Sequence, residues 1–334
     1  MSRRLTLAVG IAVSLVCLWF AMKDVRPIEV WDALRRADYL GFIALMLLTI
    51  LGFWIRALRW RWFLSTPRPL SLDSLFSATM IGFMANDILP LRLGEFVRAW
   101  ALGRRENLSK TTVLATIVVE RVVDMITLLA IFGIALLLHP IPTETTAGRL
   151  TNDGAKLLVA MSIGLTVFLV AIERWPKLLG WLLAQLAKRL PGKAGDRAVK
   201  MLQHFLEGLS LFRDVPRLLW VFLLSFAMFL VFALGLSVSM WALRIEVPWY
   251  GGLIMLVITA IGIMVPAAPG YIGTLNLACW AGLALFSVGK DLAAPFSWFY
   301  WAGQWIPVTV VGLWYLRREG LTLGAITKVQ ESGP

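Results

Sequence analysis

Ionisable side chains inside long apolar stretches are the residues of this sequence that could do chemistry. They are Asp87, Arg92, Glu95, Arg98, Glu120, Arg121 and Asp124. A charge inside a membrane segment costs at least about 2.5 kcal/mol, so it needs a partner or a function. Glu120 and Asp124 are four residues apart and share a helix face, and Arg121 can reach Asp124. Counted from Lys110, Glu120 would lie roughly 15 Å deep, near the middle of a bilayer.

Two interpretations of this charged cluster stay open. In the first, it is a static ion-pair network that holds a hairpin at 70–102 to the span that carries Glu120. In the second, Arg92 and Arg121 face a polar cavity and bind an anionic headgroup, because the planar guanidinium pairs with two phosphate oxygens at once. Both hold if the substrate competes for the same arginines.

Two interrupted segments add further candidate substrate-binding residues. The first interruption contributes Asn86 beside Asp87, and the second contributes Pro269, Gly270, Tyr271, Gly273, Thr274 and Asn276. A helix that begins after Pro90 or Gly270 would direct free N–H groups at an anion, and the glycines would allow close approach to the backbone. Tight helix packing is the alternative role for these glycines.

Other chemistries lack their motifs. The sequence has no P-loop, no nicotinamide fingerprint, no G-x-S-x-G and no H-E-x-x-H. His139 and His204 are far apart, and Cys17 and Cys279 form no disulfide framework. We therefore expect no enzyme, no cofactor and no metal site.

The composition explains where these residues must be placed. Of the 334 residues, 59% are apolar and 16% are charged, against about 45–50% and about 25% in a soluble domain. This excludes an ordinary soluble enzyme and a disordered protein. The positive-inside rule explains the net charge of +12 by Lys and Arg in cytoplasmic loops, without nucleic-acid binding. We therefore expect no nucleic-acid partner.

Hydropathy predicts six spans and two hairpins. The hairpins, about 70–102 and 249–287, are apolar but interrupted by Pro, Gly and polar residues, so each is expected to be two short helices that meet inside the membrane. With both termini in the cytoplasm, inside segments hold 21 Lys and Arg residues and outside segments hold 8, as the positive-inside rule requires. The spans lie at roughly 5–22, 40–55, 111–138, 155–172, 218–243 and 295–316.

This order of elements predicts an inverted repeat. The fold class is an all-α polytopic membrane protein, one domain over 1–334, with halves of about 1–138 and 155–318 and opposed broken or re-entrant hairpins. The breaks share a Pro-x-x-x-Gly spacing at Pro90 and Pro269. A basic connector at about 173–217 is either amphipathic helix on the cytoplasmic leaflet or a solvated linker, and 28–38 is a candidate short helix.

The Arg and Trp residues of 56–62 have two interpretations. The alternation of Arg56, Arg59 and Arg61 with Trp60 and Trp62 favours an interfacial anchor. The alternative is a site that gathers anionic lipid headgroups.

Three motifs together resemble a known family. They are Asn86-x-x-Leu-Pro-x-Arg-x-Gly-Glu95, Glu120-Arg-x-x-Asp124 and Pro269-Gly-x-x-Gly273, and Arg56-x-x-Arg59-Trp60 also fits. In this order and spacing they resemble the lysylphosphatidylglycerol synthase transmembrane-region, flippase-like (UPF0104) family, over about residues 5 to 318. One departure is Asn276, where the family commonly has Glu, which weakens any proton- or cation-linked role for that position.

The resemblance implies a helical membrane domain with paired broken helices. In two-domain members such a domain moves aminoacylated phospholipid between leaflets, and a soluble domain makes that lipid. Other members are associated with hopanoid, glycolipid or isoprenoid-linked sugar pathways. This chain ends sixteen residues after Arg318, so synthase activity is not implied.

We therefore expect a translocase for an amphiphilic lipid or lipid-linked molecule in a bacterial-type inner membrane. Its headgroup would pass through a polar cavity between the two hairpins while the tails stay in lipid. The first alternative is an accessory subunit that binds a lipid- or glycolipid-biosynthetic enzyme and transports nothing. The second is a membrane-embedded lipid-modifying enzyme. The oligomeric state is not predicted.

Overall fold

The computed structural model describes residues 3–64, 69–89, 93–138, 214–265 and 268–326, with isolated residues between 156 and 185. The chain divides into two compact units. Unit 1 comprises Met1–Trp54, Thr79–Arg98 and Met228–Gly333, and unit 2 comprises Ile55–Ala78 and Ala99–Ala227. Unit 1 therefore draws on both of the predicted halves.

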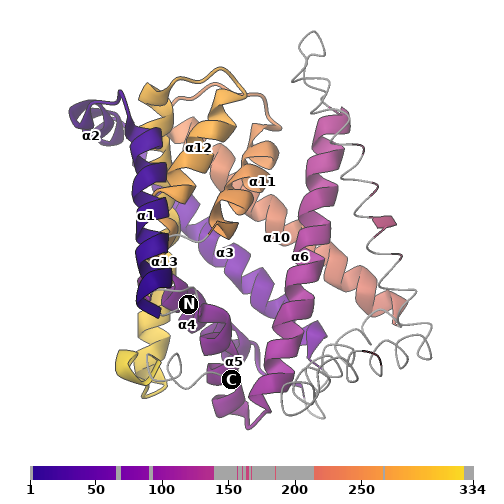
Figure 1. Ribbon diagram of the computed structural model, residues 1–334. Helices are drawn as coiled ribbons and strands as arrows, with labels where there is room; N and C mark the ends of the chain where they lie inside the picture. Colours follow the sequence, from indigo (N-terminus) through magenta and orange to yellow (C-terminus); the bar gives the residue numbers. More distant parts are fainter. Residues whose placement is uncertain are drawn as a thin grey trace. The chain divides into compact units, whose positions relative to one another are not determined.

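The described elements are all helices, which confirms the predicted all-α class (Figure 1). A high content of Leu, Ile, Val, Phe and Ala without regular alternation favours helices whose backbone polar groups are satisfied internally. The helices are α1 (Arg3–Met22), α2 (Pro27–Arg35), α3 (Tyr39–Phe63), α4 (Leu72–Ile88), α5 (Gly94–Glu106), α6 (Lys110–Leu138), α10 (Val215–Ala242), α11 (Gly251–Met264), the 3₁₀ turn η3 (Pro269–Tyr271), α12 (Thr274–Ala284) and α13 (Lys290–Arg318).

Five long helices occupy the positions of predicted spans. They are α1, α3, α6, α10 and α13, and α3 continues to Phe63, eight residues beyond the predicted end. By length and composition, α3 and α10 are clearly apolar enough to cross a membrane. The predicted short helix at 28–38 is α2. The predicted span 155–172 and most of the connector 173–217 lie outside the described ranges.

Both predicted hairpins consist of two helices with a break between them. The first pair is α4 and α5, and the second is α11 and α12 with η3 between them. Proline and glycine interrupt helices because proline lacks an N–H donor and glycine tolerates left-handed backbone. The interruptions are therefore confirmed, whereas the inverted repeat and the re-entrant path stay predictions.

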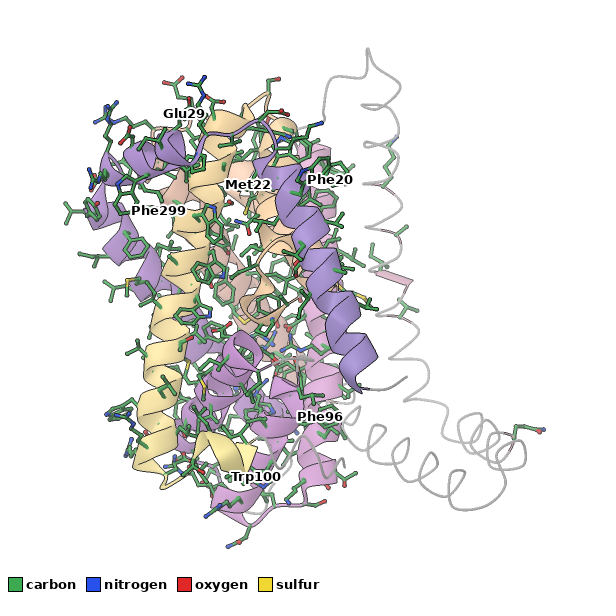
Figure 2. All side chains as sticks on the ribbon, turned by 60° about the vertical axis from the view of Figure 1, so that its left-hand side comes forward. Phe20, Met22, Glu29, Phe96, Trp100 and Phe299 are labelled. Carbon is green, nitrogen blue, oxygen red and sulfur yellow. The ribbon has the colours of Figure 1, made fainter. Side chains whose placement is uncertain are left out.

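Unit 1 is built around α12 and α13. Helix α12 packs against α11, α13 and α1, and α2 packs against α13, as Figure 1 shows. Phe299 of α13, labelled in Figure 2, makes an edge-to-face contact with Phe42 of α3, with ring centroids 5.1 Å apart. Helices approach closely where a side chain is missing, for example at Gly303, where an added Cβ would overlap Leu45.

Unit 2 has its own apolar core. The end of α3, the start of α4, the second half of α5, the first half of α6 and Val221 of α10 contribute buried residues to one cluster. Trp60 is completely buried in it, and its indole N–H donates to the Thr116 hydroxyl at 3.1 Å. A buried Trp requires such a partner for its N–H. This core fixes the facing sides of α3 and α6, which carry the charged cluster.

Candidate functional site

A buried ion-pair cluster joins α3 to α6 in unit 2. Arg56 and Arg59 are three residues apart on α3, and Glu120 and Asp124 are four apart on α6, so each pair shares a helix face. Arg56 Nη1 lies 2.8 Å from Glu120 Oε1 and 3.0 Å from Asp124 Oδ2. Arg59 Nη1 lies 2.6 Å from Asp124 Oδ1, and Arg59 Nη2 lies 3.3 Å from Glu120 Oε1. Each carboxylate therefore contacts both guanidinium groups.

Arg121 is the accessible member of this cluster. Its side chain is 40% exposed, whereas those of Arg59 and Glu120 are fully buried. Arg121 Nη2 lies 3.0 Å from Glu120 Oε1, and Nη1 lies 3.5 Å from Asp124 Oδ2. These five residues combine three guanidinium groups with two carboxylates, so they carry one excess positive charge. An anion that reaches this site would meet Arg121 first.

The sequence missed the inner half of this cluster. The anchor interpretation is wrong for Arg56, Arg59 and Trp60, which are buried, although Arg61 and Trp62 are exposed as an anchor requires. The reason is the helical period, since positions 56, 59, 60 and 63 lie on one side of α3 and 61 and 62 on the other. The sequence placed only Arg121 within reach of Asp124, whereas in the structure Arg56 and Arg59 supply the buried positive charge.

A hydroxyl on a third helix supports the cluster. Arg59 Nη1 donates to Ser225 Oγ of α10 at 2.7 Å. A buried guanidinium has five N–H donors, and each one left without an acceptor raises the free energy of the folded state. Ser225 therefore orients Arg59 toward Asp124, and the serine is a positioning residue that the apolar sequence around it concealed.

In unit 1, the first break is held by a side-chain amide. The Gly94 N–H, at the start of α5, donates to Asn86 Oδ1 at 2.7 Å. At Gly94 an added Cβ would overlap the Gly82 carbonyl oxygen, so α4 and α5 pack backbone to backbone. Arg98 is buried on α5, at 1% exposure, and Glu95 is partly exposed. Arg92 lies outside the described residues.

The second break is a left-handed turn capped by another amide. Gly270, Tyr271 and Gly273 have φ values of 71°, 61° and 91°, a region that favours glycine and strains Tyr271. The Gly273 N–H donates to Asn276 Oδ1 at 2.9 Å, and Asn276 Nδ2 donates to Ser297 Oγ of α13 at 2.8 Å. The Thr274 hydroxyl donates to the Tyr271 carbonyl at 3.3 Å. Asn276 is thus a buried structural cap.

Helix α13 brings the two breaks together within unit 1. At positions 301, 305 and 309 it presents three side chains at intervals of four residues. Trp301 Nε1 donates to the Gly270 carbonyl at 2.8 Å, and Trp305 Nε1 donates to the Asp87 carbonyl at 3.4 Å. An added Cβ on Gly270 would lie 3.5 Å from that same Asp87 oxygen. Helix α13 therefore holds the two breaks beside each other.

The Asp87 carboxylate has a hydroxyl partner on the same stripe. Thr309 Oγ1 donates to Asp87 Oδ2 at 3.3 Å. The candidate residues thus gather at two places. Glu120, Arg121 and Asp124 belong to the unit 2 cluster, and the unit 1 break junction contains Asn86, Asp87, Glu95, Arg98, Pro269, Gly270, Tyr271, Gly273, Thr274 and Asn276. No group of three or more His, Cys, Asp or Glu residues in the described ranges could hold a metal ion.

A family model and two known proteins match this chain. The family model described as the lysylphosphatidylglycerol synthase transmembrane region matches residues 7–312. A UPF0104 membrane protein of Methanothermobacter thermautotrophicus is 26% identical over 293 residues, which are 80% of this chain and 82% of that protein. Glycosyltransferase AglD of Haloferax volcanii is 28% identical over 139 residues, which are 40% of this chain and 22% of that protein.

Proposed function

Because the chain belongs to the lysylphosphatidylglycerol synthase transmembrane-region family, we propose that it is a translocase that moves an amphiphilic lipid or lipid-linked molecule between membrane leaflets. It performs no covalent chemistry in this proposal. The headgroup passes through a polar cavity between the two hairpins, and the acyl or isoprenoid tails stay in lipid. Broken helices at a membrane midplane are the usual location of a transporter's substrate site.

The observation that carries this proposal is the excess positive charge of the α3–α6 cluster. Arg56 and Arg59 already neutralise the two carboxylates at 2.6–3.3 Å. Arg121 adds a third guanidinium whose side chain is 40% exposed. The cluster therefore favours an anionic group, such as the phosphate of a lipid headgroup, bound at Arg121.

Leaflet-specific lipid labelling tests the role of Arg121. The protein is reconstituted into vesicles of phosphatidylethanolamine and phosphatidylglycerol, with a fluorescent analogue of each lipid followed in turn. Arg121→Gln is expected to reduce the translocation rate at least tenfold, and Arg121→Lys should restore it only in part because lysine lacks the bidentate fork. Arg105→Gln is the matched control, since Arg105 pairs with Asp73 at 2.7 Å outside the cluster.

The outcome of the labelling assay is decisive when each variant is shown to be folded. Equal translocation by wild type and a well-folded Arg121→Gln would refute a headgroup site at Arg121. Loss of translocation in Arg105→Gln as well would show that any lost surface charge has this effect. Identification by mass spectrometry of the lipid that copurifies with the protein then names the substrate.

We also propose the membrane arrangement, multi-pass in a bacterial-type inner membrane with both termini in the cytoplasm. The distribution of Lys and Arg supports it. In a chain whose Cys17 and Cys279 have been replaced, a single cysteine at position 148 should react with impermeant maleimide only from the outside. Reaction from the cytoplasmic side alone would overturn the arrangement and the inverted repeat with it.

A second candidate function is an accessory membrane subunit of a glycolipid-biosynthetic enzyme. The match to 22% of a protein named as a glycosyltransferase favours it, because the matching segment there accompanies a much longer chain. Such a subunit should copurify in a fixed ratio with a protein partner and should move no lipid when reconstituted alone.

A further inference from the structure

Asp87 is an ionisable side chain in an apolar helix. The proposed headgroup binding at Arg121 gives this side chain no specific role. Its carboxylate accepts a hydrogen bond from Thr309 at 3.3 Å. In the described part of the chain no Lys, Arg or His pairs with it. An unpaired carboxylate in a membrane segment is costly and is neutralised by a proton or by a bound cation. Arg92, five residues further on, lies outside the described residues.

The backbone around Asp87 also favours a positive charge. Asp87 lies in the last turn of α4, which ends at Ile88, and the C-terminal end of a helix carries the negative end of its dipole. The Asp87 carbonyl lies beside the Gly270 turn of the second break. The Asp87 carbonyl accepts the indole N–H of Trp305, and the Gly270 carbonyl accepts that of Trp301. Each carbonyl keeps a second lone pair.

On the surrounding elements, as far as the structure describes them, no ion pair joins a basic group to Asp87. Tyr271 follows the η3 glycine, and Tyr300 lies on α13, where Gln304 Nε2 donates to its hydroxyl at 3.3 Å. Glu95 and Arg98 lie on α5, with Arg98 packed against Gly82, five residues before Asp87. The Asp87 carboxylate thus has a hydroxyl within hydrogen-bond distance, and the Asp87 and Gly270 carbonyls lie at the two breaks. Such oxygens are ligands for Na⁺ at unwound helices in transporters.

We propose that Asp87, Thr309 and the carbonyls of the two breaks form a site for a small monovalent cation, either Na⁺ or a proton. Cation binding would affect both hairpins, because Trp301 and Trp305 of α13 each donate a hydrogen bond to one of the two breaks. The coupling of this site to lipid movement rests on the proposed translocase function. The binding itself does not, so the two can fail separately.

The first experiment measures thermal stability of the full chain in detergent. NaCl replaces choline chloride at constant ionic strength and pH. If Na⁺ is the ligand, the Tm of wild type should rise by about 5 °C at a hundredfold excess over Kd. Asp87→Asn should abolish the rise. Asp73→Asn is the matched control, because it removes a carboxylate from the same helix, where Arg105 already neutralises it, and it should keep the rise.

The hydroxyl provides a graded test. Thr309→Val keeps the shape of the side chain but removes the oxygen, and it should need roughly fivefold to tenfold more Na⁺ for the same shift. Thr309→Ser should behave like wild type. Equal Na⁺ dependence in Thr309→Val and wild type would exclude Thr309 from the site and overturn the proposal as stated.

If the ligand is a proton, Na⁺ has no effect and infrared spectroscopy decides. Wild type should show a protonated carboxylic acid band that Asp87→Asn removes and Asp73→Asn retains. Indistinguishable Na⁺ and infrared responses in wild type and Asp87→Asn would overturn the proposal. A Tm rise with ethanolamine in place of Na⁺ would overturn it in favour of a lipid amine.

The remaining alternative is a permanent ion pair between Asp87 and Arg92, and stability measurements on variants distinguish it. If Arg92 is the permanent partner of Asp87, Arg92→Gln should be destabilising and Asp87→Asn with Arg92→Gln should recover stability, without any response to Na⁺ or protons. That result also overturns the proposal. Cation binding in a protein that moves no lipid under any gradient would instead refute the translocase function and leave the site in place.

Discussion

Replacement of Arg59 by Gln tests the cluster most directly. Arg59 is fully buried and is the guanidinium that contacts Asp124 at 2.6 Å, Glu120 at 3.3 Å and Ser225 at 2.7 Å. Its removal leaves Asp124 and Glu120 sharing Arg56 and a partly exposed Arg121. Loss of one partner of a buried pair costs about 3–5 kcal/mol, since the other charge stays buried.

The expected result is a fall in Tm of roughly 4–7 °C for a chain of this size. Arg121→Gln removes the same chemical group from the exposed edge of the cluster, where an ion pair contributes about 0–1 kcal/mol. Its Tm should change by less than about 2 °C. The measurement is thermal unfolding in detergent, followed by near-UV circular dichroism of the 16 tryptophans.

A compensating variant separates charge from packing. Arg59→Gln with Asp124→Asn removes one charge of each sign and keeps the excess positive charge of the cluster, so it should recover at least half of the lost stability. Equal destabilisation by Arg59→Gln and Arg121→Gln would refute the division into a buried structural pair and an exposed binding residue. An Arg59→Gln variant with the Tm of wild type would refute the burial of the ion pairs.

Further predictions concern the second break. Gly270→Ala should lower the free energy of unfolding by about 1–2 kcal/mol because of the positive φ at this position. The loss should be larger still because the added Cβ would lie 3.3 Å from Trp305 Nε1. Gly320→Ala, at φ 64° with open space around it, measures the backbone contribution alone in the same thermal assay. Asn276→Ala should cost about 1–3 kcal/mol because it leaves buried partners, including the Ser297 hydroxyl, with one bond fewer. A well-folded Asn276→Ala with wild-type stability would show that the amide does not cap α12.

The sequence predicted the local features of the chain well. Runs of apolar residues predicted α1, α3, α6, α10 and α13, and Pro with Gly predicted both interruptions. These features depend on backbone propensity and on transfer of side chains from water, which are properties of neighbouring residues. The motifs that resemble the family were equally visible, since motif spacing is itself a property of the sequence.

The partners of each charge required the tertiary structure. Arg56 and Glu120 are separated by 64 positions, and Arg59 and Ser225 by 166. Hydropathy describes how each helix is solvated, but it does not say which face of α3 meets α6. The sequence alone therefore assigned Arg56 and Arg59 to the membrane surface, whereas helix packing places them inside, against Glu120 and Asp124.

The break junction shows the same division. Sequence alone located both breaks, because proline and glycine interrupt a helix at their own positions in the chain. Only the packing of α13 shows how the two breaks are held together, since Thr309 reaches Asp87 across 222 positions and Trp301 and Trp305 each bind one break. Long-range contacts of this kind depend on the mutual arrangement of whole helices, which no local pattern encodes.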